Sequence, residues 1–110
     1  MSLIMTGPLT WISSLAGNMS TAVMAKIQEA GKRQYIKSIS LTVAQGATVT
    51  ISEGTNATAS KTLLQIYNAT NSIFYTHKFI NPVPLDVNKS LIIGSSNATG
   101  MSFIIEGETV

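Results

Sequence analysis

The chain has 110 residues, which is enough for one small domain with its own hydrophobic core and too few for two. Charged residues make up only 11% of the sequence, whereas a typical soluble domain has about 25%. We therefore expect an unusually neutral surface, which suits contacts between proteins better than it suits a freely diffusing enzyme. The sequence has no cysteine, which excludes disulfide bonds, thiolate metal sites and cysteine nucleophiles.

Residues 1–20 form the first segment and carry no charged side chain, because the first charge of the chain is that of Lys26. A secretion signal would begin with basic residues, and the pair Gly7-Pro8 interrupts the apolar run. We therefore predict that this segment is an ordered N-terminal arm or a set of early strands. No apolar run reaches the length of about 18 residues that crosses a bilayer, so we expect no membrane partner.

Trp11 is the only tryptophan and lies in an apolar stretch with Leu9, Ile12 and Leu15. Tryptophan is favoured at the energetic centres of protein interfaces. This preference predicts that Leu9, Trp11, Ile12 and Leu15 contact a neighbouring subunit. The alternative is that Trp11 packs against its own domain, and the sequence does not decide between the two.

Residues 21–30 are compatible with a helix and with a strand. The segment contains good helix formers, and Gly31 would end a helix at its C-terminus. The alternation from Val23 to Ile27 also fits a strand, and the strands expected elsewhere favour that choice. We predict a strand here, at the start of a sandwich domain that covers residues 21–110.

Apolar and polar residues alternate over residues 35–43 and again over residues 48–51, which is the signature of strands. Gln45 and Gly46 provide a turn between them, so residues 35–52 are predicted to form a β-hairpin. A loop is expected next, at residues 53–56.

The second half of the chain continues the pattern of short strands and turns. The segment 81–85 contains Pro82 and Pro84 and should leave any central ladder, because proline donates no backbone hydrogen bond. Strands are predicted at residues 63–67, 72–80, 88–93 and 101–106, with turns at 68–71 and 94–100. Strands of this spacing predict an all-β fold, an antiparallel β-sandwich of jelly-roll type with an N-terminal arm.

Residues able to perform chemistry are few. His77, the only histidine, cannot form a two-histidine metal site, and as a general base it would need a nucleophile and a carboxylate beside it. We interpret it as an ordinary strand residue that shares a face with Tyr75 and Phe79. The only basic cluster, around Lys32-Arg33, lacks interleaved aromatic residues, so no nucleic acid is expected as a partner.

The five acidic residues do not indicate a catalytic pair. Glu53 and Asp86 are predicted to lie in loops as solvated charges, and Glu106 and Glu108 in a solvated C-terminal tail. Carboxylate catalysis would require two of these groups to face each other across a cleft. We therefore predict no catalytic, cofactor-binding or metal-binding residue, and a chain that is not an enzyme.

Three short motifs follow one another in an order that resembles small structural proteins of tailed bacteriophages. A Gly-Lys-Arg turn at residues 31–33 starts a strand, and the strand Ala-Thr-Val-Thr at residues 47–50 leads to Gly54. Asn-Pro-Val-Pro-Leu at residues 81–85 then leads into a short strand and a final hairpin. The resemblance extends from about Thr21 to Glu106.

This resemblance implies a jelly-roll component of the virion. Capsid decoration (cement) proteins of this kind sit as homotrimers on the capsid surface and bridge subunits of the major capsid protein, often through an N-terminal arm. The resemblance thus gives residues 1–20 a role in contact and implies a location on the capsid. The alternative is a tail or fibre component that recognises a host-surface glycan through loops at residues 53–60 and 94–100.

Overall fold

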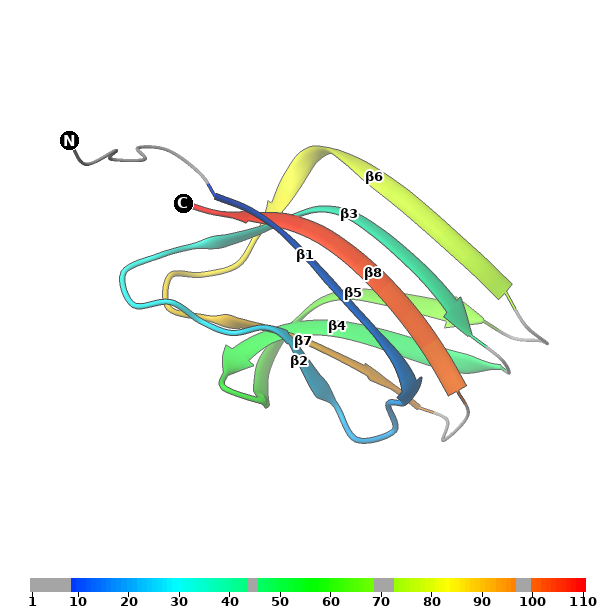
Figure 1. Ribbon diagram of the computed structural model, residues 1–110. Coiled ribbons are helices and arrows are strands. Elements are labelled where there is room, and N and C mark those ends of the chain that lie inside the picture. The colour runs from blue at the N-terminus through cyan, green and yellow to red at the C-terminus, as the bar shows by residue number, and fades with distance from the viewer. Residues whose placement is uncertain (1–8, 44–45, 69–72, 97–99) are drawn as a thin grey trace.

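The computed structural model describes residues 9–43, 46–68, 73–96 and 100–110. These residues form eight β-strands and no helix (Figure 1). The strands are β1 (Leu9–Asn18), β2 (Val23–Lys26), β3 (Gln34–Val43), β4 (Ala47–Thr55), β5 (Thr58–Asn68), β6 (Ile73–Pro84), β7 (Ser90–Ser95) and β8 (Gly100–Thr109).

The strands build two four-stranded sheets that face each other. One sheet has the order β1-β8-β3-β6 and the other β2-β7-β4-β5, and every neighbouring pair is antiparallel. The pairs β1·β8, β2·β7, β3·β6 and β4·β5 are nested, so the chain resembles one long hairpin rolled into a sandwich. This is the strand order of an eight-stranded jelly roll. The predicted all-β antiparallel sandwich is confirmed.

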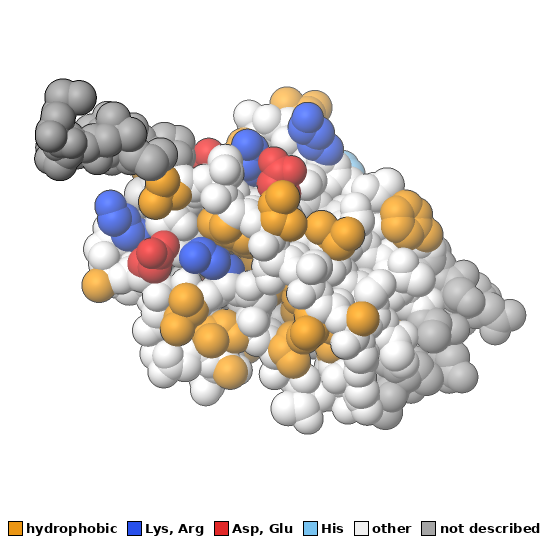
Figure 2. Space-filling view, viewed as in Figure 1, with side chains coloured by type: hydrophobic (Ala, Val, Ile, Leu, Met, Phe, Trp, Pro, Cys, Tyr) orange, Lys and Arg blue, Asp and Glu red, His pale blue; other side chains and the backbone are white. Residues whose placement is uncertain are grey.

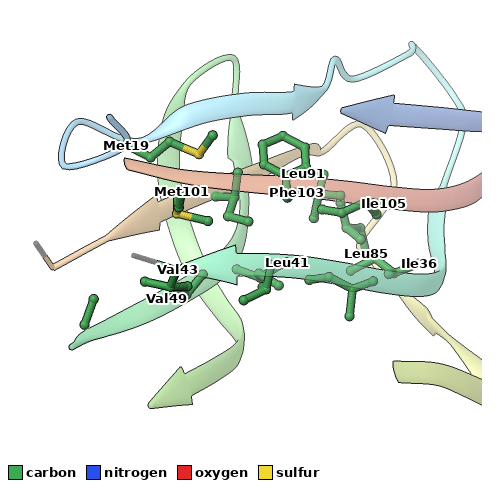
Figure 3. Close-up of a cluster of buried hydrophobic side chains, with 14 residues drawn as sticks. Met19, Ile36, Leu41, Val43, Val49, Leu85, Leu91, Met101, Phe103 and Ile105 are labelled. Atoms are coloured by element: carbon green, nitrogen blue, oxygen red, sulfur yellow. The ribbon is translucent and has the colours of Figure 1, made fainter. Parts of the chain in front are cut away.

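The core lies between the two sheets and follows the period-2 pattern of the strands (Figure 3). In β8 the buried residues Met101, Phe103 and Ile105 alternate with more exposed ones. In β3 the alternation changes phase between Ile36 and Ile39, because a bulge shifts the register at that point. The other members are Met19, Leu41, Val43, Ala47, Val49, Ile51, Leu85, Leu91 and Ile93.

The predicted β-hairpin over residues 35–52 is wrong. Strands β3 and β4 do occupy this region, but β3 pairs with β6 and β8, whereas β4 pairs with β5 and β7. The chain therefore crosses from one sheet to the other between the two strands. Val43 and Val49 are both buried, so the apolar faces of the two strands meet across the core. Alternation alone predicts a strand but not the sheet to which it belongs.

The prediction of a strand within residues 21–30 is confirmed for Val23–Lys26, which is β2. The chain then turns at residues 29–32, where the amide of Lys32 donates to the carbonyl of Glu29 at 3.0 Å and Gly31 has a φ of 73°. This positive φ suits glycine, since it has no Cβ.

The loop predicted at residues 53–56 is shorter than expected, because β4 continues through Thr55. The chain reverses at Asn56, which has a φ of 53°, and β5 begins at Thr58. The segment 81–85 is not in a central ladder, as predicted, because β6 is the edge strand of its sheet. Residues 69–71 and 97–99 of the turns predicted at 68–71 and 94–100 lie outside the described residues, and the second turn is shorter than predicted because β7 extends through Ser95 and β8 begins at Gly100.

Candidate interaction surface at strand β1

Residues 9–18, which the sequence assigns to an arm or an early strand, form β1 at the edge of the first sheet (Figure 1). The strand pairs with β8 at all ten positions, from Leu9 opposite Thr109 to Asn18 opposite Gly100, without a register shift. In the part of the chain that the structure describes, no strand pairs with its other side. That side therefore presents a row of backbone N–H and C=O groups that another strand could bind.

Three large hydrophobic side chains of β1 are exposed. Leu9 and Leu15 lie on the inner face of the sheet, because Leu15 is opposite the buried Phe103, and they are 51% and 48% exposed. Ile12 lies on the outer face opposite Glu106 and is 72% exposed. Figure 2 shows hydrophobic side chains scattered in small groups over the face of the molecule that carries β1. Within seven residues, β1 thus offers apolar contacts on both of its faces.

Trp11 packs against its own sandwich, which is the second of the two alternatives for this residue. Its indole N–H donates to Oε1 of Gln34 at 3.0 Å, and its ring lies against Gly107 on β8. Gln34 is fully buried, and its Oε1 also accepts a 2.6 Å hydrogen bond from the hydroxyl of Thr109. Nζ of Lys26 lies 6.0 Å from the centroid of the indole. Trp11 therefore anchors β1 to the domain, and Leu9, Ile12 and Leu15 are the more exposed members of the predicted interface.

The other three sheet edges carry features that discourage pairing with a further strand. Strand β2 has only four residues, one of them Lys26, and contains a register shift. Strand β5 contains Lys61 and two register shifts. Strand β6 contains Lys78, Pro82 and Pro84, and its register jumps from position 83 to position 78. Strand β1 has no charged residue, no proline and no register shift, so it is the edge best suited to pairing.

The electrostatic surroundings of β1 are close to neutral. Glu106, the cross-strand neighbour of Ile12, forms an ion pair of 3.7 Å with Lys37 on β3. A surface hollow beside the strand is lined by Thr10, Trp11, Ile12 and Glu106. This lining has one carboxylate and no second group for acid–base chemistry, so the hollow suits contact rather than catalysis.

The structure does not bring His77 together with acidic residues into a catalytic or metal-binding cluster among the described residues. His77 is exposed on the edge strand β6, with its ring 4.6 Å from that of Phe79 and 6.5 Å from that of Tyr75, measured between centroids. Its cross-strand neighbour is Ile39. Among the described residues, no group of three His, Cys, Asp or Glu residues could hold a metal ion. Nor does any helix in the described ranges have the length and apolarity to span a membrane.

The predicted positions of the acidic residues are wrong in two cases. Glu53 belongs to β4 and is only 1% exposed, rather than solvated in a loop. Its Oε1 accepts a hydrogen bond of 3.2 Å from the backbone amide of Asp86, so it ties the segment after β6 to the second sheet. Glu108 lies within β8, not in a tail, because that strand extends to Thr109, and Glu106 lies in the part of β8 that was predicted as a strand.

The two loops of the glycan-binding alternative lie at opposite ends of the second sheet. The turn at Asn56 follows Gly54, which is opposite Ser90, whereas residues 94–100 begin near Ser95, which is opposite Val49. Five residues of β4 therefore separate them, a length of about 17 Å at about 3.3 Å per residue. The backbone amide of Asn56 also donates to Gln28 Oε1 at 2.7 Å, which fixes the first turn to the domain.

Comparison with known proteins assigns the chain to no family. No protein-family model matches the chain, and no curated protein matches it significantly. The functional argument therefore depends on the surface itself. The neutrality of residues 9–18 and their lack of proline could have indicated an open edge from the sequence, whereas the hydrogen bond between Trp11 and Gln34 joins residues 23 positions apart and had no local signal.

Proposed function

We propose that this protein is a structural subunit of a bacteriophage virion, a capsid decoration protein that stabilises the shell by binding its surface. The observation that carries this proposal is the edge of β1, which is long, uncharged and flanked by exposed Leu9, Ile12 and Leu15. The jelly-roll strand order supports the proposal, since this architecture is common in viral capsid domains. The same architecture also occurs in lectins and cupins, so the fold alone does not assign the role.

The proposed mechanism is adhesion through repeated contacts. Each copy offers backbone hydrogen-bonding groups and apolar side chains along β1 for contact with another copy, and the linked copies would bind the major capsid protein together. Many copies on one shell would act together, so individually weak contacts would give a high overall avidity. The ordered sandwich supports this role, because a preformed strand loses little conformational freedom on binding.

The location of the chain in virions tests this proposal. Particles made from the genome that encodes the chain would be purified and labelled with gold-conjugated antibodies against it, with particles from a gene deletion as the control. We expect label on the head surface of the complete particles only. Label confined to the tail would replace this proposal by the tail or fibre alternative, and absence from all particles would contradict both.

The deletion strain also tests the proposed stabilisation. Heads without the decoration protein should release DNA at a lower temperature than complete heads, and addition of purified protein should restore the difference. Equal release temperatures would show that the chain does not stabilise the shell. Gene position provides a first indication, since a place beside the major capsid gene favours decoration and a place among tail genes favours the alternative.

A further inference from the structure

We propose that β1 pairs antiparallel with β1 of a second copy of this chain, around a two-fold axis that passes beside Ile12. This inference depends on the proposed use of β1 as the assembly contact, and it does not depend on where in a virion the chain lies. It names the occupant of the β1 edge and the register of the contact.

The register follows from the exposed side chains. An antiparallel pair centred on Ile12 places this residue opposite its own copy on the outer face. The same register places Leu9 opposite Leu15 on the inner face, twice by symmetry. All three exposed apolar side chains of β1 then have an apolar partner across the contact, which stabilises a strand pair.

A shift of the centre by one residue removes this match. Centred on Ser13, the pair would place Ile12 opposite Ser14 and Leu9 opposite Gly17. Only Leu15 would keep a large neighbour, the anchored Trp11. The position of the apolar residues along β1 therefore favours the centre at Ile12.

Charge and symmetry both favour a second copy as the occupant. Strand β1 has no charged residue, and the two acidic residues opposite it, Glu106 and Glu108, lie one strand away from the contact on β8, the first in an ion pair with Lys37. The contact is isologous and closes on itself, because both β1 edges are used at once. The result is a continuous eight-stranded sheet with the order β6-β3-β8-β1-β1-β8-β3-β6. Its two outer strands are both β6, which contains Pro82 and Pro84.

Two-fold pairing predicts a dimer, in contrast to the homotrimer that the phage resemblance implies. A three-fold ring would need a second, different strand edge to accept β1 from the next copy. The edges of β2, β5 and β6 are all interrupted by charged residues and register shifts. A dimer leaves only these interrupted edges exposed.

Single engineered cysteines test the register, because the chain has no cysteine of its own. Directly opposite residues of an antiparallel pair lie about 4.5–5.5 Å apart between Cα atoms, which is within the range of a disulfide. Ile12→Cys should therefore give a disulfide-linked dimer under mild oxidation. In the matched control Ser14→Cys, on the same exposed face, the two positions would lie about 13 Å apart, and no dimer should form. Equal cross-linking of both variants, or of neither, would overturn the register.

The mass in solution tests the pairing itself. Sedimentation equilibrium of the unmodified chain should show a dimer, twice the 11.7 kDa mass of one chain. Ile12→Lys should weaken the dimer about tenfold or more, because it places two like charges opposite each other. It should fold normally, since the new lysine lies opposite Glu106. The control Ile80→Lys changes an isoleucine that is 97% exposed on β6 and should leave the dimer unchanged.

Each outcome separates the pairing from the proposed function. A monomer or a trimer at all concentrations, in a chain that antibodies detect on virion heads, would overturn the pairing and leave the decoration role in place. A dimer of the predicted register, in a chain absent from virions, would support the pairing and contradict the decoration role.

Discussion

Replacement of Gly107 by alanine tests how β1 is held to the domain. Gly107 lies on β8 opposite Trp11 of β1 and Ile36 of β3, and the carbonyl oxygen of Tyr35 on β3 lies close to it. A Cβ at this position would lie 2.7 Å from Cε2 of Trp11, and closer still to Cζ2 of the same ring and to the carbonyl oxygen of Tyr35. The carbonyl belongs to a central strand and cannot rotate away as a side chain could. Either the indole or the β3–β8 ladder must therefore move.

Overpacking of this kind costs about 1–3 kcal/mol, and the backbone contact places Gly107→Ala near the upper end, at about 3 kcal/mol. An unfolding entropy of about 2.1 cal/mol/K per residue gives about 230 cal/mol/K for 110 residues. The melting temperature should therefore fall by about 13 °C. The matched control is Gly100→Ala on the same strand, where an added Cβ meets no atom within 4 Å. It should change stability by less than about 1 kcal/mol.

Thermal unfolding followed by circular dichroism measures both variants, and fluorescence reports the indole directly, because Trp11 is the only tryptophan. Gly107→Ala should shift the emission to longer wavelength, as the ring loses contact with β8. A melting temperature within 2 °C of the unmodified chain, with unchanged emission, would refute the packing of Trp11 against Gly107.

Three further outcomes follow from the packing. Phe103→Ala should lower the free energy of unfolding, measured with urea, by about 3–5 kcal/mol. Ile104→Ala, on the outer face of the same strand, should lower it much less. Equal losses of stability in the two variants would contradict the assigned faces. Trp11→Phe should lower the free energy of unfolding by only about 1–2 kcal/mol, because Oε1 of Gln34 still accepts a hydrogen bond from the hydroxyl of Thr109. A loss of stability as large as that of Phe103→Ala would show that this remaining hydrogen bond does not compensate for the lost indole donor. At a protein concentration that favours the monomer, Ile12→Lys should leave the free energy of unfolding within about 0.5 kcal/mol of that of the unmodified chain. A larger loss would place Ile12 in the core.

The strands were largely predictable, because a sheet with one buried face imposes a period of two on the sequence. The alternation at residues 35–43 and the prolines at residues 82 and 84 gave β3 and the edge position of β6 correctly. The sheet partners were not predictable by the same rule. A short turn can close a hairpin within one sheet or carry the chain across the core to the other sheet. Strands β3 and β4 lie in different sheets, so the turn between them crosses the core.

The candidate surface was predictable in composition but not in structure. The neutral stretch with Leu9, Ile12 and Leu15 indicated a contact region, and these side chains are exposed. The anchoring of Trp11 and the burial of Glu53 depend on partners distant in the sequence, Gln34 and the amide of Asp86. Such contacts leave no local pattern, which is why Glu53 was expected to be solvated.

Amide hydrogen exchange along β1 tests most directly whether this strand is the contact surface of the protein. Exchange would be measured by mass spectrometry in a dilute and in a concentrated solution of the unmodified chain, with the edges of β5 and β6 as internal references. We predict that residues 9–15 become more protected as the concentration rises, while the two reference edges do not change. Exchange in β1 that is independent of concentration, or protection that appears at β5 or β6 instead, would contradict the assignment of β1 as the contact between copies.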